Sequence, residues 1–280
     1  MTNFLRRTVT GAFIVIFILG GLWLHPISFF VVVAVMLAGT QHEYYLMVRS
    51  TGVRPQPVTG IVSGFILYVT SSMIAVGWLS MKGFLVLIPV MVTVMTIELF
   101  RKEEKPFDSL AHTLFSVLYT AVPLSMFPFA AFGRTGAEPL LQMEGVLYSP
   151  GILTGFFLLL WTNDTGAYLV GSALGRHPLF KRISPKKSWE GFAGGIVLTL
   201  IVAQLLPGWL GVTGTAGWMV IALIVSVAGT LGDLLESMLK RSLGLKDSGT
   251  VMPGHGGFLD RFDSVVVAFP LVYLYLMLAV

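Results

Sequence analysis

Cysteine is absent from this chain of 280 residues, and charged residues are scarce. The absence of cysteine excludes disulfide bonds, thiolate zinc sites and cysteine nucleophiles. Asp, Glu, Lys and Arg make up 11% of the residues, compared with roughly 25% in soluble domains, whereas hydrophobic residues make up 55%. Long polar linkers and low-complexity tracts are also missing. This composition excludes an ordinary soluble domain and predicts a polytopic membrane protein.

Apolar runs account for most of the chain. A helix needs about 20 mostly apolar residues to cross the hydrocarbon core, and none of the runs shows the sustained period-two alternation of a transmembrane barrel. Because only helices and closed barrels satisfy their backbone in lipid, the sequence predicts an all-α integral membrane protein, a bundle of about nine transmembrane helices. The expected spans are residues 8–24, 27–48, 58–80, 83–100, 109–132, 151–172, 191–209, 216–239 and 264–280.

The positions of Lys and Arg predict the orientation of this bundle. With a cytosolic N-terminus, 16 of the 18 Lys and Arg residues fall in cytosolic segments, and only Lys82 and Arg134 fall on the other side. An odd number of spans then places the C-terminus on the opposite side of the membrane. The net charge of +4 reflects this asymmetry, and no nucleic-acid partner is expected. No clear small-residue cleavage site follows Trp23, so we interpret the first apolar run as an uncleaved span.

The polar chemistry divides the chain into two regions. Residues 1–150, with about five spans, are expected to form a scaffold that cradles lipid. Residues 151–280, with about four spans, are expected to carry catalysis together with the cytosolic loops 175–190 and 240–263. The loop 133–149 on the outer side is expected to be solvated.

A few polar residues and prolines interrupt the first region. His42 and Glu43 end the second span and Glu98 ends the fourth, where we expect solvation at the membrane interface. Pro123 and Pro128 lie inside the fifth span and predict a kink, because proline removes a backbone donor and clashes with the preceding turn.

The eighth span ends in a polar face. Its five polar residues follow i, i+3, i+4, i+7, i+8 spacing, which places them on one side of a helix. Placing an ionisable group such as Asp233 in the membrane, just after the apolar run 221–231, costs about 2.5 to 3.5 kcal/mol of insertion free energy. This cost favours a functional role for the group. The alternative is that the two carboxylates only pair with a lysine one turn away or with a neighbouring span. The five residues are Asp233, Glu236, Ser237, Lys240 and Arg241.

Two further carboxylates begin the ninth span. Asp260 and Asp263 lie three residues apart, so they can share a helix face and favour the positive end of that helix. A role in capping the N-terminus of this helix would explain only one of the two carboxylates. Asp233 and Asp260, from different spans, could hold Mg²⁺ while leaving positions for substrate phosphates and water. A second cation is left open.

Glycines dominate the loop between these two spans. Residues 242–259 include five glycines and Pro253, an irregular backbone that must line a polar cavity because it cannot face lipid. Amides in such turns form anion-binding nests. Four cationic side chains lie in or next to this loop in sequence, and they could neutralise a triphosphate or alternatively attract anionic lipid. They are Lys240, Arg241, Lys246 and Arg261. His255 is interpreted as a hydrogen-bonding member of the turn, since no second His follows at metal-ligand spacing.

A second polar site lies inside the sixth span. Asn163 and Asp164 follow an uncharged run, so Asp164 is a functional candidate. Ala167, Gly171 and Gly175 repeat every fourth residue, which predicts a close contact with another helix.

Three stretches of sequence resemble one enzyme family. From Ser237 to Asp263 the order Ser-x-Leu-Lys-Arg-x4-Lys-Asp-x-Gly-x2-Met-Pro-x-His-Gly-Gly-Phe-x-Asp-Arg-Phe-Asp resembles the signature of phosphatidate cytidylyltransferases, also called CDP-diacylglycerol synthases. Asp-Thr-Gly-Ala-Tyr from Asp164 and Ser-Pro-Lys-Lys-Ser-Trp-Glu-Gly from Ser184 resemble the same family. Ser188 stands where the family commonly has Thr, and Met252 where it commonly has Ile or Leu, and both changes preserve the chemistry. The resemblance extends from about residue 161 to 263.

This resemblance implies an activity and a set of roles. The reaction would transfer CMP from CTP to phosphatidic acid, giving CDP-diacylglycerol and pyrophosphate. Asp233 and Asp260 would form a metal-dependent catalytic centre with Mg²⁺, and Asp263, Lys240 and Arg241 would also be catalytic. The residues implied in substrate binding are Ser237, Lys246, Asp247, His255, Gly256, Gly257, Arg261, Asp164, Ser184, Lys186, Lys187 and Ser188.

The same resemblance implies a location and partners. The protein would lie in a bacterial cytoplasmic membrane with its active site facing the cytosol, and it would bind CTP, phosphatidic acid and membrane lipids. A homodimer is compatible with the sequence. Two alternatives stay open: a CTP-dependent polyprenol kinase, which would transfer the γ-phosphoryl group, and a cation-coupled transporter, whose carboxylates would bind the coupling ion. Against the transporter, no inverted repeat is visible, and the polar groups gather at one membrane face.

Overall fold

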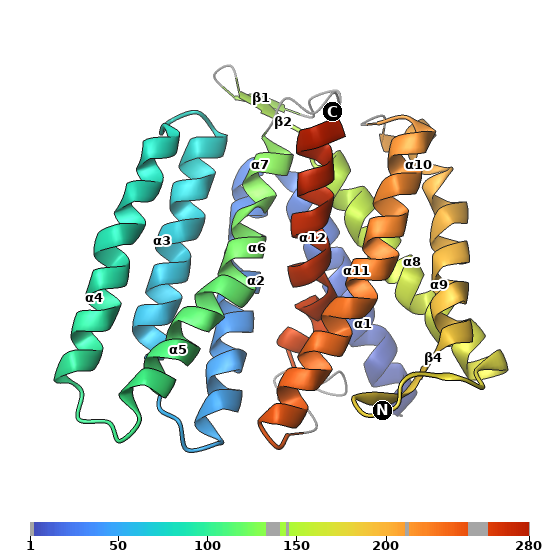
Figure 1. The fold of residues 1–280 in the computed structure, drawn as a ribbon. Helices are drawn as coiled ribbons and strands as arrows, with labels where there is room; N and C mark the ends of the chain where they lie inside the picture. Colours follow the sequence, from blue (N-terminus) through green and yellow to red (C-terminus); the bar gives the residue numbers. More distant parts are fainter. Residues whose placement is uncertain (1–2, 133–140, 144–145, 211–212, 246–256, 280) are drawn as a thin grey trace. The chain divides into compact units, whose positions relative to one another are not determined.

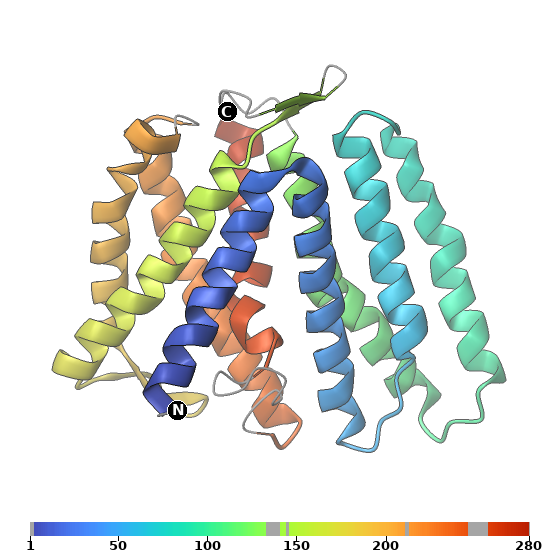
Figure 2. The same cartoon turned by 180° about the vertical axis from the view of Figure 1, so that it is seen from behind.

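Helices form almost all of the regular structure (Figures 1 and 2). The computed structural model describes residues 3–132, 141–143, 146–210, 213–245 and 257–279. Each of the predicted spans contains helix in these residues, which confirms the all-α membrane fold. The number of spans that cross and their direction stay predictions. Within the described ranges, the segments long and apolar enough to cross a membrane are Pro26–Arg49, Pro57–Ala75, Met81–Phe100, Pro106–Ala131, Thr215–Ser242 and Leu259–Ala279.

The chain packs into two compact units, which are described separately. The first comprises Met1–Phe129 with Ser242–Phe262, and the second comprises Ala130–Arg241 with Asp263–Val280. Prolines begin three helices of the first unit, at a position where the missing N–H would have no partner in the helix. Its elements are α1 (Asn3–Leu24), α2 (Pro26–Arg49), α3 (Pro57–Ala75), the 3₁₀ helix η1 (Met81–Val86), α4 (Leu87–Phe100), α5 (Pro106–Ser116), the π-helix η2 (Val117–Ala121) and α6 (Val122–Ser125), with α7 (Phe127–Ala131) at the boundary.

Helix α2 lies at the centre of the first unit. It packs against α1, α3 and α5, and Phe29, Met36 and Leu37 on it are fully buried. Small residues set the spacing, since a Cβ on Gly60 of α3 would overlap the hydroxyl oxygen of Tyr45. That hydroxyl donates to the carbonyl of Thr113 on α5, at 3.0 Å. Three helices are thus fixed around one side chain of α2.

The fifth span is interrupted in the region where its prolines were expected to kink it. The helix is divided into α5, η2, α6 and α7, and Pro123 and Pro128 lie in the last two pieces. Because Pro123 cannot donate an N–H, the regular helical pattern changes to a π-turn just before it.

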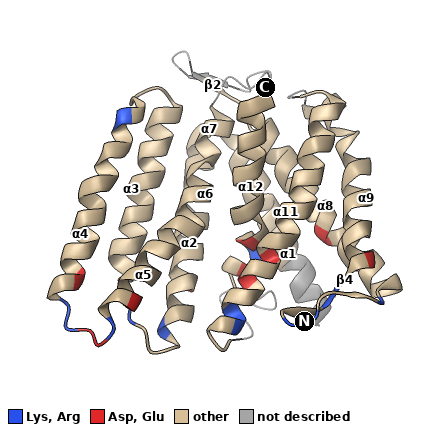
Figure 3. Ribbon diagram, viewed as in Figure 1, with Lys and Arg blue, Asp and Glu red and all other residues tan. Residues whose placement is uncertain are grey.

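Charged residues of the first unit lie mainly at one end of its helices (Figure 3). Lys82 belongs to η1, which precedes α4, whereas Arg101, Lys102 and Lys105 follow the last residue of α4. Helix α4 therefore carries few cations at one end and several at the other. This is the asymmetry on which the predicted orientation depends.

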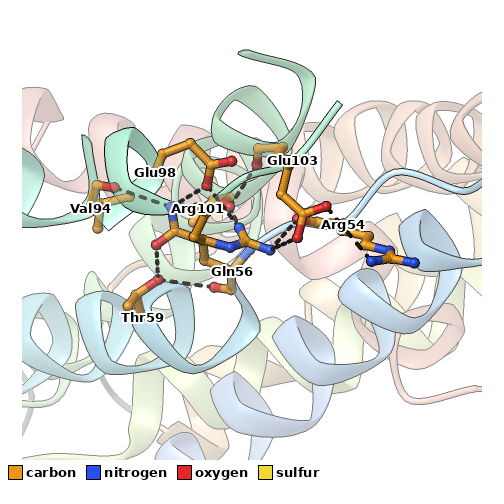
Figure 4. A network of polar contacts seen from close by, with 9 residues as sticks. Arg54, Gln56, Thr59, Val94, Glu98, Arg101 and Glu103 are labelled. Atoms are coloured by element: carbon orange, nitrogen blue, oxygen red, sulfur yellow. Dashed lines mark hydrogen bonds and ion pairs between the residues drawn. The ribbon is translucent and has the colours of Figure 1, made fainter. Parts of the chain in front are cut away.

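Glu98 at the end of α4 corrects one sequence expectation. Its carboxylate is 4% exposed, so it is not solvated at the interface. Instead, Oε2 of Glu98 accepts hydrogen bonds from Nε2 of Gln56 at 2.5 Å and from Nη1 of Arg101 at 2.8 Å (Figure 4). Gln56 also donates to the carbonyl of Val94, and Arg101 also pairs with Glu103. This network joins the segment before α3 to the end of α4.

The second unit is formed by long helices and two short hairpins. Residues of the loops expected at 133–149 and 175–190 form antiparallel pairs, β1 with β2 and β3 with β4. Helix α8 makes its most extensive contact with α9. The elements are β1 (Leu141–Met143), β2 (Val146–Tyr148), α8 (Gly151–Leu174), β3 (Pro178–Phe180), β4 (Ser184–Ser188), α9 (Trp189–Ala203), α10 (Leu206–Leu210), α11 (Thr215–Ser242) and the main part of α12 (Leu259–Ala279).

Close helix contacts hold this unit together. A Cβ on Gly155 of α8 would overlap the indole ring of the fully buried Trp218 on α11. The rings of Phe156 and Phe269 meet edge to face at 5.2 Å, which joins α8 to α12. On α11, a Cβ on Gly232 would lie 2.6 Å from the backbone oxygen of Asp263. Glycine at 232 therefore lets α11 and α12 approach at the level of their carboxylates.

Candidate active site

A cavity lined by both charged and apolar residues opens within the second unit, between α8, β4, α9 and α11. Its volume is about 520 Å³, within the range of about 300–1,000 Å³ typical of small-molecule sites. Two stretches that the sequence singles out separately, the sixth span and the 184–191 segment, meet here with α11. The lining residues that sequence reasoning selected are Asp164, Ser184, Lys186, Lys187, Ser188 and Asp233.

Asp233 and Lys187 form an ion pair at this cavity. Both side chains are partly exposed, at 37% and 27% respectively, so each can still be reached by a ligand. The hydroxyl of Ser237, one turn further along α11, donates to Oδ1 of Asp233 at 3.4 Å. An ion pair that lines a cavity can be exchanged for ligand contacts, with a phosphate on the lysine and a cation on the carboxylate.

Asp263 adds a third carboxylate to the same region. It is 8% exposed, its Oδ1 accepts the backbone N–H of Ser264 at 2.5 Å, and it interacts electrostatically with Asp233, Asp164 and Lys187. Burying carboxylates near one another is costly unless positive charge compensates them. Lys187 supplies one positive charge, and a bound cation would supply more.

The β3–β4 hairpin carries the basic side of the cavity, and its ends are firmly held. Ser188 caps α9, because its hydroxyl oxygen accepts the N–H of Gly191 at 3.1 Å. Glu190 accepts the backbone N–H groups of Arg176 and His177 and contacts the His177 ring at 2.5 Å. The hydrogen bond from the His177 side chain, together with those backbone donors, lowers the pKa of Glu190 to about 2. The carboxylate thus stays charged at neutral pH and closes the base of the hairpin.

The predicted small-residue contact on α8 is confirmed, and its partner is α9. A Cβ on Gly191 would lie 2.8 Å from the carbonyl oxygen of Ala167 and 3.1 Å from the Cα of Gly171. A Cβ on Gly175 would lie 2.8 Å from the Ser188 hydroxyl oxygen. This close approach places the phosphate-binding candidates of β4 beside the polar stretch of α8.

The end of α11 divides its polar face between two roles. Glu236 is 1% exposed, and its Oε2 pairs with the ammonium group of Lys240 at 2.5 Å. The ion pair that the sequence offered as an alternative is thus present for Glu236, whereas Asp233 faces the cavity. Arg241 is exposed, and neither Lys240 nor Arg241 is among the residues that line the cavity. Their catalytic roles stay predictions.

The other half of the predicted site lies in the first unit or outside the described residues. Oδ2 of Asp260 accepts the N–H of Gly257 at 2.9 Å, and Arg261 is exposed in the first turn of α12. Because Asp260 and Asp233 belong to different units, the cation that they would share stays a prediction. The predicted residues outside the described part of the chain are Lys246, Asp247, His255 and Gly256.

The donor set of the cavity fits magnesium. Mg²⁺ usually takes one or two protein carboxylates and completes its shell with phosphates and water. Asp233 offers such an oxygen ligand at the cavity, with Asp164 nearby. Across the described ranges, no three His, Asp or Glu residues are grouped to enclose a metal by themselves. The arrangement is consistent with an ion that substrate phosphates help to hold.

Several cavity residues were given no role by sequence reasoning, although Asn163 belongs to the polar stretch noted in the sixth span. Asn163 is 3% exposed, lines the cavity, and its Oδ1 has no hydrogen-bond partner among the described residues. Phe192 and Tyr168 contribute aromatic rings, and Thr230 lies one turn before Asp233. Because Asn163 is adjacent to Asp164 in the sequence, it could have been predicted to line the same site. The apolar and aromatic residues gave no such indication, because they resemble any other residue of a membrane helix.

The fold and the cavity define a polytopic membrane protein with a site suited to anionic, phosphate-bearing ligands. The chain belongs to the cytidylyltransferase family, whose model matches residues 5–279. It is 38% identical over 197 residues to the phosphatidate cytidylyltransferase of Staphylococcus aureus (strain COL), covering 70% of each chain. It is 35% identical over 218 residues to that of Staphylococcus haemolyticus, covering 77% of this chain and 78% of the relative. The Bacillus subtilis enzyme of the same name is 48% identical over 123 residues, covering 43% and 45%.

Proposed function

We propose that this chain is a phosphatidate cytidylyltransferase, which transfers CMP from CTP to phosphatidic acid and releases pyrophosphate. The observation that carries the proposal is the cavity of the second unit, in which Asp233 of α11, Asp164 of α8 and the lysines of β4 come together. Relatives that bear this name match most of the chain.

In the proposed reaction, an oxygen of the lipid phosphate attacks the α-phosphorus of CTP. The bond from the α-phosphorus to the oxygen bridging to the β-phosphate breaks, and that oxygen leaves on pyrophosphate. A phosphate monoester has a second pKa of about 6, so the attacking group is largely ionised at neutral pH. The reaction therefore needs neither a protein nucleophile nor a strong general base.

The main task of the protein is to bring two anions together. Lys186 and Lys187 offset the repulsion between the phosphates, and the hydroxyls of Ser184 and Ser188 orient them. A bound Mg²⁺, held by Asp233 and Asp260 in this proposal, supplies charge neutralisation and Lewis acidity at the triphosphate. Asp263 interacts electrostatically with Asp233 and Asp164, and a bound cation would relieve the repulsion among these carboxylates.

The membrane arrangement follows from the same proposal. The protein lies in the cytoplasmic membrane with its N-terminus and its active site on the cytosolic side, so CTP enters from water and phosphatidic acid enters laterally from the bilayer. The surrounding lipids are then both solvent and substrate reservoir.

The test is a reaction of the purified protein with phosphatidic acid, Mg²⁺ and CTP labelled at the α-phosphorus. Label should enter the lipid, and Asp233→Asn should lower the rate by about 100-fold or more. Asp108→Asn, which changes an exposed carboxylate of α5 in the first unit, is the matched control and should retain activity. In a parallel reaction with CTP labelled at the γ-phosphorus, transfer of that label to the lipid would show a lipid kinase and reject the proposal, as would conversion of no lipid in either reaction.

A further inference from the structure

We infer that Glu43 of α2 is a positioning residue for this reaction, because it fixes the start of α12, the helix that carries Asp260. The inference rests on the proposed function. It assigns a role to the first region of the chain, for which the sequence predicted only a lipid-cradling scaffold.

The burial of Glu43 corrects the expectation that it is solvated at the interface. The residue is 1% exposed, whereas its neighbour His42 is exposed as expected. Oε2 of Glu43 accepts the backbone N–H of Leu259, the first residue of α12, at 2.5 Å. The first N–H groups of a helix have no partner within it, and a carboxylate at that end is favoured by both hydrogen bonding and the helix dipole. Glu43 therefore caps a helix 216 residues away in sequence.

A second contact between the same two segments lies one turn earlier on α2. A Cβ on Gly39 would lie 2.6 Å from Cδ1 of Phe258, so only glycine leaves room for that ring. The centre of the Phe258 ring also lies 5.7 Å from that of Phe262, one turn into α12. Helix α2 thus holds the start of α12 at two points, a hydrogen bond and an aromatic contact.

Asp260 lies directly beside these restraints. It follows Leu259, and its Oδ2 accepts the N–H of Gly257 at 2.9 Å, so residues 257–260 form a compact turn around its carboxylate. Removing the Glu43 acceptor would leave the N–H of Leu259 without its partner and loosen this turn. The side chain of Asp260 would then lose its defined direction, although Glu43 itself is too buried to meet a substrate.

The test compares two replacements of nearly equal size. Glu43→Gln keeps an oxygen acceptor for Leu259, whereas Glu43→Met does not. We expect Glu43→Met to lower kcat by about 10–100-fold, as is typical when a residue behind a ligand is removed, with KM for CTP changed by less than about threefold. Glu43→Gln should retain most of the wild-type kcat. His42→Ala, an exposed neighbour, is the control and should behave as wild type.

A third variant separates positioning from general stability. Gly39→Leu displaces Phe258 while keeping the carboxylate of Glu43, and it should also lower kcat more than it raises KM. Thermal unfolding in detergent is measured for every variant. Equal kcat for Glu43→Gln and Glu43→Met, or a loss of activity that only follows the fraction of folded protein, would overturn the inference. If the wild-type protein forms no CDP-diacylglycerol, the proposed function itself fails, which is a different result.

Discussion

At the scale of single residues, the ammonium group of Lys187 both neutralises Asp233 and lines the cavity. Charge-assisted hydrogen bonds contribute about 1.5–3 kcal/mol each. We therefore expect Lys187→Met to lower kcat/KM for CTP by about 10–100-fold. The measurement is initial-rate kinetics with CTP varied at saturating phosphatidic acid.

Lys181 provides the matched control for Lys187. It lies in the exposed turn between β3 and β4 and is not among the residues that line the cavity. Lys181→Met removes the same charge from the same hairpin and should leave kcat/KM within about twofold of wild type, as is usual for exposed surface sites. A similar loss in both variants would show that the hairpin acts only through its net charge.

At the scale of secondary-structure elements, the contact between α11 and α12 sets the distance between Asp233 and Asp263. A methyl group at Gly232 would lie 2.6 Å from the backbone oxygen of Asp263 and 2.9 Å from the Cα of Ser264. Backbone atoms cannot move without shifting the helix. Gly232→Ala should therefore lower stability by about 1–3 kcal/mol and activity with it, measured by thermal unfolding and by the labelling assay.

Gly208 in α10 offers the control for this change, because nothing lies within 4 Å of its added Cβ. Gly208→Ala should be neutral or slightly stabilising, since alanine is favoured over glycine in helices by about 1 kcal/mol. If Gly232→Ala were as well tolerated as Gly208→Ala, the close approach of α11 and α12 would not determine the site.

Most of the elements could be predicted from the sequence. Long apolar runs leave the backbone no alternative to helix in lipid, and the spacing of Ala167, Gly171 and Gly175 correctly indicated a close contact, although not that α9 is the partner. The β3–β4 hairpin was not predicted, because β3 is only three residues long and β4, with the sequence Ser-Pro-Lys-Lys-Ser, lacks the apolar residues of a typical strand. The solvation predicted for Glu43 and Glu98 was wrong, because their partners, Leu259 and Gln56, are remote in sequence.

At the scale of the whole molecule, the residues predicted from motifs are divided between the two packed units. Asp164, Asp233 and the β4 lysines meet in the second unit, whereas Asp260, from the motif that follows Asp233 in sequence, belongs to the first. A signature read along the chain gives residue types and order. It contains no information on which packed unit each residue joins, since that depends on contacts such as Gly232 with Asp263.

The absence of cysteine makes the predicted membrane orientation directly testable. Lys82 lies in η1 before α4, and Lys102 follows α4 at its other end, so one predicted span separates them. The single variants Lys82→Cys and Lys102→Cys each carry one thiol. In intact bacterial cells a membrane-impermeant thiol reagent should label the Lys82→Cys variant. It should label the Lys102→Cys variant only after the membrane is permeabilised, because positively charged segments stay in the cytosol.

The same labelling decides on which side the β3–β4 hairpin lies. The two predicted spans 109–132 and 151–172 separate Lys102 from Lys181, so both lysines lie on the cytosolic side if both spans cross. Lys181→Cys should therefore stay unlabelled in intact cells and react after permeabilisation. Labelling of this variant in intact cells would mean that one of these two helices does not cross, and the lysines of β4 would then face away from cytosolic CTP.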